Sequence, residues 1–329
     1  MRAAVITRPG GPEVLEIQER PAPAPANNQV LIRVRASALN RADLLQRQGQ
    51  YPAPPGAPAD IPGMEFVGEV AALGAGVTRW REGDRVFGIV GGGGNAEYLV
   101  SDADVVARVP ATLSWTDAAA IPEAFITAHD AMVTQAGVCA GETVLIHAVG
   151  SGVGLASVQL ARAWDATPYG TARTASKIDR AREFGLEDGV VVGDDLAVVV
   201  AAVERWTSGK GIDVTMDLVA GAYVAAEIQA AAKRGRIMLI GTVAGRNATI
   251  PVGMTLGKRL TIRGTVLRAR SIEEKREVTT AFARDVVPLF DSGAIRPTVD
   301  SVYPLSDIGA AHERLASNET FGKVVLDVG

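Results

Sequence analysis

A glycine-rich turn joins a hydrophobic run to a helical pattern in the segment ETVLIHAVGSGVGLASVQLARAW, residues 142–164. The apolar run predicts a buried strand, and the pattern after the turn places Leu155, Val158 and Leu160 on one helical face. Glycines allow close approach to the backbone, and a helix N-terminus offers unpaired N–H groups to an anion. The segment therefore predicts strand, turn and helix, with a turn suited to a pyrophosphate.

The remainder of the middle of the chain alternates strand and helix patterns, and Ser176 is the expected N-cap of one helix. The expected strands are 167–172, 212–219, 236–243 and 260–266. The expected helices are 176–184, 196–207 and 223–233. Such alternation predicts an α/β fold with a doubly wound parallel sheet of the Rossmann type.

Short β-prone runs broken by glycine and proline make up the first third of the chain. They lie at 30–35, 86–90, 97–100 and 105–109. This texture predicts an irregular, barrel-like β domain. After a charged helix at about 272–290 the strand texture returns, so we expect the tail to rejoin the first domain. The predicted domains are 1–121 completed by 268–329, and 122–267.

Composition excludes several classes of protein. The net charge is −4 with both signs scattered, which argues against a nucleic-acid partner. No run of about 18 apolar residues predicts a membrane span, and the start of the chain does not resemble a signal peptide. With Cys139 as the single cysteine no intrachain disulfide forms, and we expect a cytoplasmic protein.

The choice of dinucleotide depends on the segment about twenty residues after the turn. NAD sites usually carry Asp or Glu there, but residues 171–177 read TARTASK, without an acid. Arg173, Ser176 and Lys177 instead suit a 2′-phosphate, which predicts NADPH. Two alternatives remain: a glycine turn without a ligand, and basic residues that are merely solvated, although a lysine is disfavoured at a helix start.

Several further segments carry a resemblance that covers essentially the whole chain. They are SALNRADLLQRQGQYPAPPG at 37–56, PGMEFVGEV at 62–70, AAAIPEAFITAHDAM at 118–132 and the terminal NETFGKVVLDV. With the turn, they resemble the zinc-independent branch of the medium-chain dehydrogenase/reductase superfamily. The similarity is greatest to its NAD(P)H quinone oxidoreductases, the zeta-crystallin-like group. The resemblance implies a GroES-like irregular β-barrel domain beside the Rossmann domain.

The resemblance also implies roles for single residues. It places Tyr51 and Asn40 on the substrate side and Thr127 at the nicotinamide carboxamide. The other expected cofactor residues lie in the turn, after later strands and near the C-terminus: Gly150, Ser151, Gly152, Val153, Gly154, Gly241, Thr242, Val243, Leu267, Arg268, Ser271, Asn318 and Lys323. Ser151 stands where the family often has glycine, and Val191 and Val192 stand where relatives often have a tyrosine.

No metal site is expected. Zinc-dependent relatives bind the catalytic ion through Cys, a His–Glu pair and a second Cys, and the corresponding places hold Asn40, Met64, Glu65 and Glu123. Asn and Met are poor zinc ligands, and a structural zinc lobe needs clustered cysteines. We interpret His147 as a packed, hydrogen-bonded residue. Without a Lewis acid the chemistry favours reduction of electron-poor substrates.

We therefore hypothesise hydride transfer from NADPH to a quinone or an activated alkene, with Tyr51 and Asn40 donating to the developing oxyanion. Tyr51 or water supplies the proton. Alternatively, Tyr51 only packs, Asn40 only caps the helix at 41–47, and Asp43 is a surface or first-turn charge.

The rival functions are an enone, alkenal or enoyl-thioester reductase, and a non-catalytic nucleotide-binding sensor or structural protein. The strand from Leu260 to Val266 ends the predicted sheet and is rich in β-branched residues. Exposed sheet edges are usually covered or paired, and the family pairs them across a two-fold axis. We therefore expect a homodimer through this strand.

Overall fold

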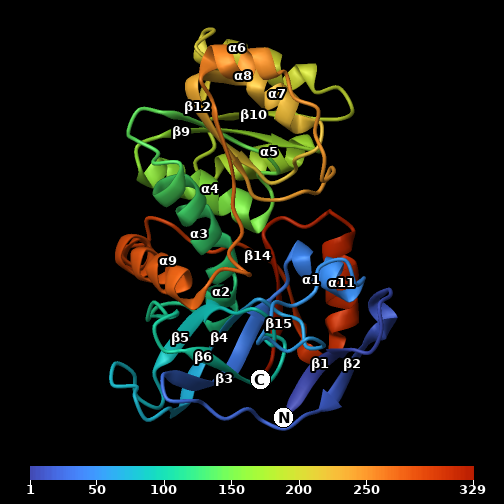
Figure 1. Ribbon diagram of the computed structural model, residues 1–329, viewed down its shortest axis with the longest axis vertical. Helices are drawn as coiled ribbons and strands as arrows, with labels where there is room; N and C mark the ends of the chain where they lie inside the picture. Colours follow the sequence, from blue (N-terminus) through green and yellow to red (C-terminus); the bar gives the residue numbers. More distant parts are fainter. The chain divides into compact units, whose positions relative to one another are not determined.

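The computed structural model describes residues 1–329, and the chain divides into two compact units. Unit 1 comprises Met1–Ile126 and Leu267–Gly329, and unit 2 comprises Thr127–Val266. Both ends of the chain belong to unit 1 (Figure 1).

Unit 2 is built on a six-stranded parallel sheet with the order β10-β9-β8-β11-β12-β13. The strands are β8 (Thr143–Ile146), β9 (Thr167–Ala172), β10 (Asp188–Val191), β11 (Ile212–Asp217), β12 (Ala231–Leu239) and β13 (Thr261–Gly264). The helices are α4 (Gly152–Ala163), α5 (Ala175–Arg182), α6 (Ala197–Thr207), α7 (Tyr223–Ala230) and α8 (Val252–Lys258), preceded by the π-helical turn η2 (Asp130–Gln135). This confirms the predicted Rossmann sheet.

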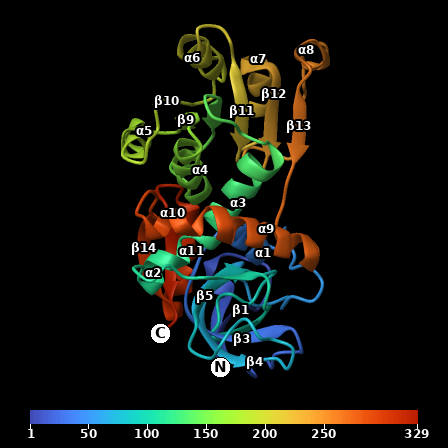
Figure 2. The same cartoon turned by 90° about the vertical axis from the view of Figure 1, so that its left-hand side faces the viewer.

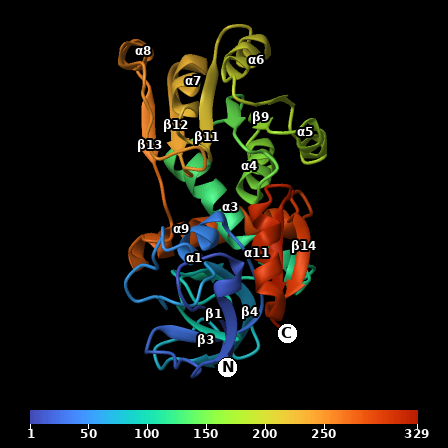
Figure 3. The same cartoon turned by 90° about the vertical axis from the view of Figure 1, so that its right-hand side faces the viewer.

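The order of the strands locates the ligand-binding edge of this sheet. From β8 the chain winds outward through β9 and β10, and it then returns to pair β11 with the other side of β8. The direction of winding reverses between β8 and β11, and open α/β sheets bind ligands at the carboxyl ends of such strands. At the opposite end of the order, β13 pairs only with β12 and forms the outer edge (Figures 2 and 3).

Unit 1 contains a seven-stranded, mostly antiparallel sheet with the order β14-β15-β3-β4-β5-β7, in which β6 also pairs with β3. The strands are β3 (Gln29–Ala38), β4 (Glu65–Leu73), β5 (Arg85–Ile89), β6 (Tyr98–Asp102), β7 (Val106–Arg108), β14 (Val299–Pro304) and β15 (Lys323–Asp327), with β1 (Arg2–Ile6) and β2 (Leu15–Glu19) as a separate pair. The predicted GroES-like domain is confirmed. Because β15 pairs with β3, the C-terminal segment is part of this sheet.

Most helices of unit 1 have nine residues or fewer, and the longest is α9 (Ile272–Asp285) with 14 residues. The others are α1 (Arg41–Arg47), α2 (Trp115–Ala119), α3 (Pro122–His129, whose last three residues belong to unit 2), α10 (Val287–Asp291), α11 (Ile308–Ala316) and the 3₁₀ turns η1 (Pro12–Val14) and η3 (Leu305–Asp307). Helix α11 lies beside β14 and β15 (Figure 1).

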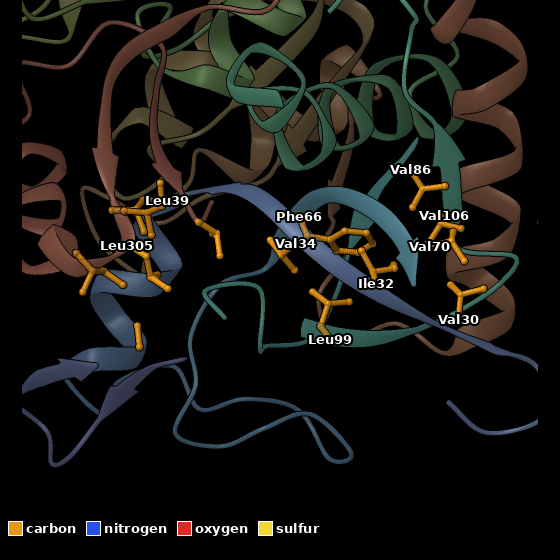
Figure 4. Close-up of a cluster of buried hydrophobic side chains, with 14 of the residues drawn as sticks. Val30, Ile32, Val34, Leu39, Phe66, Val70, Val86, Leu99, Val106 and Leu305 are labelled. Atoms are coloured by element: carbon orange, nitrogen blue, oxygen red, sulfur yellow. The ribbon is translucent and has the colours of Figure 1, made fainter. Parts of the chain in front are cut away.

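The core of unit 1 joins strands that are distant in the sequence. Phe66 of β4 lies beside Ile32 and Val34 of β3, with Leu99 of β6 next to them (Figure 4). All four side chains are buried. Because alternate residues of β3 point to the same face, one strand supplies several members of this cluster.

Several predicted elements differ from the observed ones. The helix expected at 272–290 is two helices, α9 and α10, and Pro288, which has no N–H, lies at the start of the second. The expected N-cap Ser176 is wrong: Thr174 occupies that position, and α5 begins at Ala175. The helix expected to end at Lys233 ends at Ala230, where β12 begins.

Candidate functional site

The glycine turn of unit 2 connects β8 to α4 and leaves backbone donors available. Ser151 is the N-cap of α4, and its Oγ accepts a hydrogen bond of 3.1 Å from the N–H of Gly154. The N–H groups of Gly152 and Val153 make no hydrogen bond within the chain. The first N–H groups of a helix lack intrahelical partners, so these two donors can meet an anion.

Gly154 is required by close packing rather than by its torsion angles. A Cβ atom at this position would lie 2.4 Å from the carbonyl oxygen of Ala148 and 2.8 Å from Cα of Val149. Ala148 itself has a φ of 52°, in the left-handed region. The turn is therefore a narrow backbone cradle, and its geometry fits the diphosphate of a dinucleotide.

The residues expected to hold a 2′-phosphate follow β9 directly. Arg173 and Ser176 are exposed and Lys177 is partly exposed, at the beginning of α5. No acidic side chain lies between Thr171 and Ile178. Lys177 has an electrostatic or hydrogen-bonding interaction of its own, and Arg173 acts electrostatically on Tyr223. The segment presents positive charge at the strand end where an adenosine 2′-phosphate is expected.

A buried polar cluster lies immediately before the turn. His147 Nδ1 is 2.8 Å from Oγ1 of Thr171, and Nε2 is 3.0 Å from Oε1 of Glu227. Burial lowers the pKa of His147 to about 4 and raises the pKa of Glu227 to about 8. Burial, with repulsion from Glu227, raises the pKa of Asp217 to about 7. At neutral pH His147 and Glu227 are both uncharged, so their contact is not an ion pair. His147, whose Nδ1 is hydrogen-bonded to Thr171, is the packed residue that we expected.

A cavity of about 440 Å³ opens beyond the ends of β11 and β12 in unit 2. Its lining is mainly apolar and includes Gly241 and Thr242, two of the expected cofactor residues, together with Arg246 and Asn247. Val243, the third residue of that segment, is not part of the lining and is 60% exposed.

In unit 1, Asn40 belongs to a closed group of three side chains. Its Nδ2 donates to Oε1 of Glu65 at 2.8 Å, and its Oδ1 accepts from Nζ of Lys323 at 2.6 Å. Lys323 Nζ also lies 2.6 Å from Oε1 of Glu65 and donates to the carbonyl of Leu39 at 2.9 Å. Asn40 also occupies the N-cap position of α1, where it forms a capping box with Asp43 in addition to these tertiary contacts.

Asp43 is buried, so the expectation of a surface charge is wrong. Its Oδ2 accepts from the N–H of Asn40 at 2.7 Å and its Oδ1 accepts from the N–H of Gly63 at 3.1 Å. Burial outweighs these hydrogen bonds and raises the pKa of Asp43 to about 6. The carboxyl group lies in the first turn of α1, as the alternative expectation had it, and there it ties the helix start to the segment before β4.

Tyr51 lies against Arg268, whose guanidinium carbon is 5.0 Å from the centre of the tyrosine ring. Arg268 is buried and donates to the carbonyl of Gly91 at 2.8 Å and to Oε1 of Gln46 at 2.5 Å. Burial is the main cause that raises the pKa of the Tyr51 hydroxyl above its usual value.

Four other predicted residues are dispersed. Thr127 is buried at the start of unit 2, and Leu267 is buried at the point where the chain returns to unit 1. Ser271 caps α9, and its Oγ accepts from the N–H of Glu274 at 3.2 Å. Asn318 has a left-handed φ of 62° and accepts a hydrogen bond from Arg41.

The roles of Glu65, Glu227 and Asp217 in these clusters were missed from the sequence. The available signal was a charged residue inside an apolar run, as Glu65 in MEFVGEV and Glu227 in AAEIQAA. Charged residues are rarely fully buried unless they are paired, so such a pattern points to a partner without naming it.

Residues 26–111 match the family described as alcohol dehydrogenase GroES-like domain, and residues 152–284 match the family described as zinc-binding dehydrogenase. A quinone oxidoreductase from Lama guanicoe is 33% identical over 331 residues, which cover 99% of this chain and 97% of the relative. The chain belongs to the medium-chain dehydrogenase/reductase superfamily. Within this superfamily of oxidoreductases it falls in the zeta-crystallin-like quinone oxidoreductase branch.

Solved structures of this superfamily share the fold over the full length. A structure described as an NAD-dependent alcohol dehydrogenase has a TM-score of 0.88 at 32% identity and covers 100% of both chains. A mycobacterial protein in complex with NADPH has a TM-score of 0.87 at 28% identity and also covers 100% of both chains. The chain therefore shares the fold of proteins that bind a nicotinamide cofactor. No helix is long and apolar enough to cross a membrane.

Proposed function

We propose that this protein is an NADPH-dependent quinone oxidoreductase that works without a metal ion. The observation that carries the cofactor choice is the segment after β9, where Arg173 and Lys177 occur and no acid lies between Thr171 and Ile178. An acid at that strand end would bind the ribose 2′-hydroxyl of NAD and repel a 2′-phosphate. The backbone cradle at Gly152 and Val153 fits the diphosphate shared by both cofactors.

The proposal of metal independence rests on the side chains at the places where zinc-dependent relatives bind the catalytic ion. Asn40 and Met64 are poor zinc ligands, and the ammonium group of Lys323 binds the Glu65 carboxylate. No group of three or more His, Cys, Asp or Glu side chains in the chain has the arrangement to hold a metal ion. The family described as zinc-binding matches only residues 152–284, which exclude these places.

NADPH supplies the hydride in this proposal. The chain supplies hydrogen-bond donors for the substrate oxygen, on which negative charge develops during reduction. The hydroxyl of Tyr51, like that of an ordinary tyrosine, carries its proton at neutral pH, and it is the proposed donor of both the hydrogen bond and the proton. The partly exposed amide of Asn40 is the second proposed donor.

The same donors suit the carbonyl oxygen of an enone or alkenal, so reduction of an activated alkene is the alternative enzymatic function. A quinone and an enone share a conjugated carbonyl, and an oxyanion develops in either case. The third possibility is a protein that binds the nucleotide without turnover. The relative from Lama guanicoe carries the name quinone oxidoreductase, which supports quinone reduction over the two alternatives.

We also propose a homodimer that forms along the β13 edge of unit 2. Large apolar side chains are exposed on and near this edge: Val243, Ile250, Val252, Met254, Leu256 and Val266. Leu256 is 71% exposed. Exposed apolar side chains beside an unpaired strand are typical of an association site. Light scattering of the purified protein tests the dimer.

A cytoplasmic location is a further proposal. It rests on Cys139, which is exposed and is the single cysteine of the chain. Proteins of oxidising compartments commonly use disulfides, and a lone exposed thiol fits a reducing compartment better. Imaging of a tagged protein, checked against compartment markers, tests it.

The deciding experiment measures nucleotide oxidation with a panel of 1,2-quinones, 1,4-quinones and enones, with NADPH and NADH side by side. Steady turnover of NADPH with quinones is the expected result. Tight binding of NADPH without turnover of any acceptor would identify the non-catalytic alternative. Faster turnover of enones than of quinones would identify the alkene reductase.

The cofactor assignment has its own test. The variant Arg173→Ala/Lys177→Ala should raise the Kd for NADPH by about 10-fold to 100-fold and leave the Kd for NADH nearly unchanged, because only NADPH carries the extra phosphate. Arg205→Ala, which removes an exposed charge from α6, is the control. An unchanged affinity for NADPH would contradict the assignment.

A further inference from the structure

We propose that Lys323 is a positioning residue: together with Glu65 it fixes the Asn40 amide so that this group offers an N–H donor, and not its oxygen, to the substrate. The inference rests on the proposed function, in which Asn40 stabilises the substrate oxyanion. It assigns Lys323 a role other than the cofactor contact that the family resemblance implies.

The three side chains form a ring of short contacts. Lys323 Nζ reaches Oδ1 of Asn40 and Oε1 of Glu65, each at 2.6 Å, and Nδ2 of Asn40 reaches the same Oε1 at 2.8 Å. The third proton of the ammonium group goes to the carbonyl of Leu39 at 2.9 Å. Lys323 therefore has no donor left for another ligand, because an ammonium group carries three.

Opposite charges on the two sides of the amide determine its orientation. An ammonium group only donates, so it must face the oxygen of Asn40. An ionised carboxylate only accepts, so it must face the nitrogen. A rotation of the amide by 180° would bring Oδ1 against Glu65 and Nδ2 against Lys323, and both contacts would become repulsive.

The arrangement leaves one N–H of Asn40 available. The amide nitrogen carries two protons, and one is used by Glu65. The other N–H donates to the carbonyl of Ala38 at 3.4 Å, which is a long and weak hydrogen bond that a substrate oxygen can replace. The hydrogen bond from the ammonium group to Oδ1 polarises the amide and makes the remaining N–H a stronger donor.

The ring is held rigidly by the backbone around it. Glu65 is 0% exposed, and its other oxygen accepts from the N–H of Glu123 at 2.9 Å. Gly322, directly before Lys323, has a φ of 95°, and a Cβ there would lie 2.4 Å from the carbonyl oxygen of Thr298. Lys323 thus enters β15 from a fixed turn, and water does not separate the buried charges.

The test removes both charges together, because one unpaired buried charge alone can unfold the protein. In Lys323→Met/Glu65→Gln the amide of residue 65 can pair with either end of the Asn40 amide, so the orientation is no longer fixed. We expect kcat with a quinone to fall about 10-fold to 100-fold, close to the effect of Asn40→Ala, while KM for NADPH stays within about twofold. In an Asn40→Ala background the same pair of changes should alter kcat by less than about twofold.

The matched control is Arg35→Met/Glu69→Gln. This pair is an ion pair of 2.9 Å that links β3 to β4. Both side chains are partly exposed, and Arg35 donates to Glu69 and to the carbonyl of Gly329. It should leave kcat unchanged. A purely structural role for Lys323 predicts equal losses of kcat with and without Asn40, and this additivity would overturn the inference.

A second readout does not depend on turnover. In protein labelled with ¹⁵N-asparagine, the two side-chain N–H signals of Asn40, assigned by loss in Asn40→Ala, should be widely separated in wild type and should approach each other in Lys323→Met/Glu65→Gln. Unchanged signals would overturn the inference. If wild-type protein turns over quinones while the paired variant keeps full kcat, the proposed function stands and the inference fails. A wild type without turnover would overturn both.

Discussion

The turn at the start of α4 and the side-chain group around Asn40 are built in opposite ways. In unit 2 the atoms available to a ligand are backbone N–H groups of Gly152 and Val153, which have no partner within the chain. In unit 1 they belong to side chains that already bind one another, and only one N–H of Asn40 is without a short contact. The turn offers backbone N–H groups to a ligand. At the second site the charged side chains around Asn40 leave one N–H group for a ligand.

The difference shows how each site responds to substitution. The glycine turn binds a ligand only while no side chain occupies the space beside its backbone, so an added methyl group should weaken ligand binding most. In the group of Lys323, Glu65 and Asn40 the two opposite charges stabilise each other, so the loss of one leaves the other buried without a partner. The predictions below separate these two kinds of sensitivity.

The largest expected effect is on the charged ring. Lys323→Met leaves the buried Glu65 carboxylate without its cation, and we expect the free energy of unfolding to fall by about 3–5 kcal/mol. Lys323→Met/Glu65→Gln should recover at least about half of that loss. Urea denaturation measures both variants. The single change Arg35→Met, at a partly exposed ion pair, should cost no more than about 1 kcal/mol. Equal losses of unfolding free energy for Lys323→Met and Arg35→Met would show that burial does not make the Lys323–Glu65 pair more sensitive to the loss of one charge.

The next effect is on the backbone cradle. Gly154→Ala places a Cβ 2.4 Å from the carbonyl oxygen of Ala148, so the turn must move away from its present path. We expect the Kd for NADPH to rise about 100-fold, since displacements near 1 Å have effects of that size. Calorimetry measures it. Gly193→Ala, where a Cβ would meet no atom within 4 Å, is the matched control. Normal NADPH binding by Gly154→Ala would show that the turn is not the diphosphate site.

A third prediction concerns the side-chain cluster that lies next to the cradle in unit 2. Because the pKa of Glu227 is raised to about 8, the folded state keeps a proton that the unfolded chain releases above about pH 4.5. The folded state therefore loses stability as pH rises from about 4.5 through about 8. Glu227→Gln cannot ionise, so its advantage over wild type should grow across this range to on the order of 2 kcal/mol at pH 8.

Urea denaturation at three pH values between about 5 and 8.5 tests the sign. Glu204→Gln, at an exposed position of α6, should follow the wild-type profile. His147 acts in the opposite direction, because its pKa is lowered to about 4 and its contribution is lost as pH falls from about 6.5 to 4. A constant difference between Glu227→Gln and wild type at every pH would contradict the prediction.

The smallest expected effect is on the cap of α4. Ser151→Ala removes the acceptor for the N–H of Gly154 and should lower the free energy of unfolding by about 1 kcal/mol. Thr174→Ala changes the N-cap residue of α5, whose side chain makes no capping hydrogen bond, and should have almost no effect. Thermal denaturation compares the two variants. Equal losses would show that the Ser151 hydroxyl does not act as a cap.

Some helices and strands were predictable from the sequence pattern, and others were not. The strand at 167–172 was predicted with the bounds of β9, and the helix after the turn corresponds to α4. The strand β10 and the helix α8 were missed. β10 has only four residues, too few to show an alternating pattern. α8, with the sequence VGMTLGK, contains two glycines and leaves Val252 and Leu256 exposed. Neither pattern separates a helix or strand from a loop.

Some of the site residues could also be predicted from local sequence, and others could not. The cradle is local, since every atom of the turn comes from neighbouring residues and small side chains mark it in the sequence. Asn40 and Tyr51 were predicted as substrate residues only through the family resemblance. The side chains that contact them, Glu65, Lys323 and Arg268, come from other segments of unit 1.

The sequence by itself determined the parallel sheet, the barrel-like domain and the glycine cradle, because periodicity and backbone freedom act between near neighbours. Only the tertiary structure decided which charges became neighbours. Lys323 and Glu65 are paired because β15 returns to the sheet that begins with β3, and His147 meets Glu227 because α7 packs beside the sheet. An electrostatic contact depends on distance in space, and folding sets that distance independently of separation along the chain.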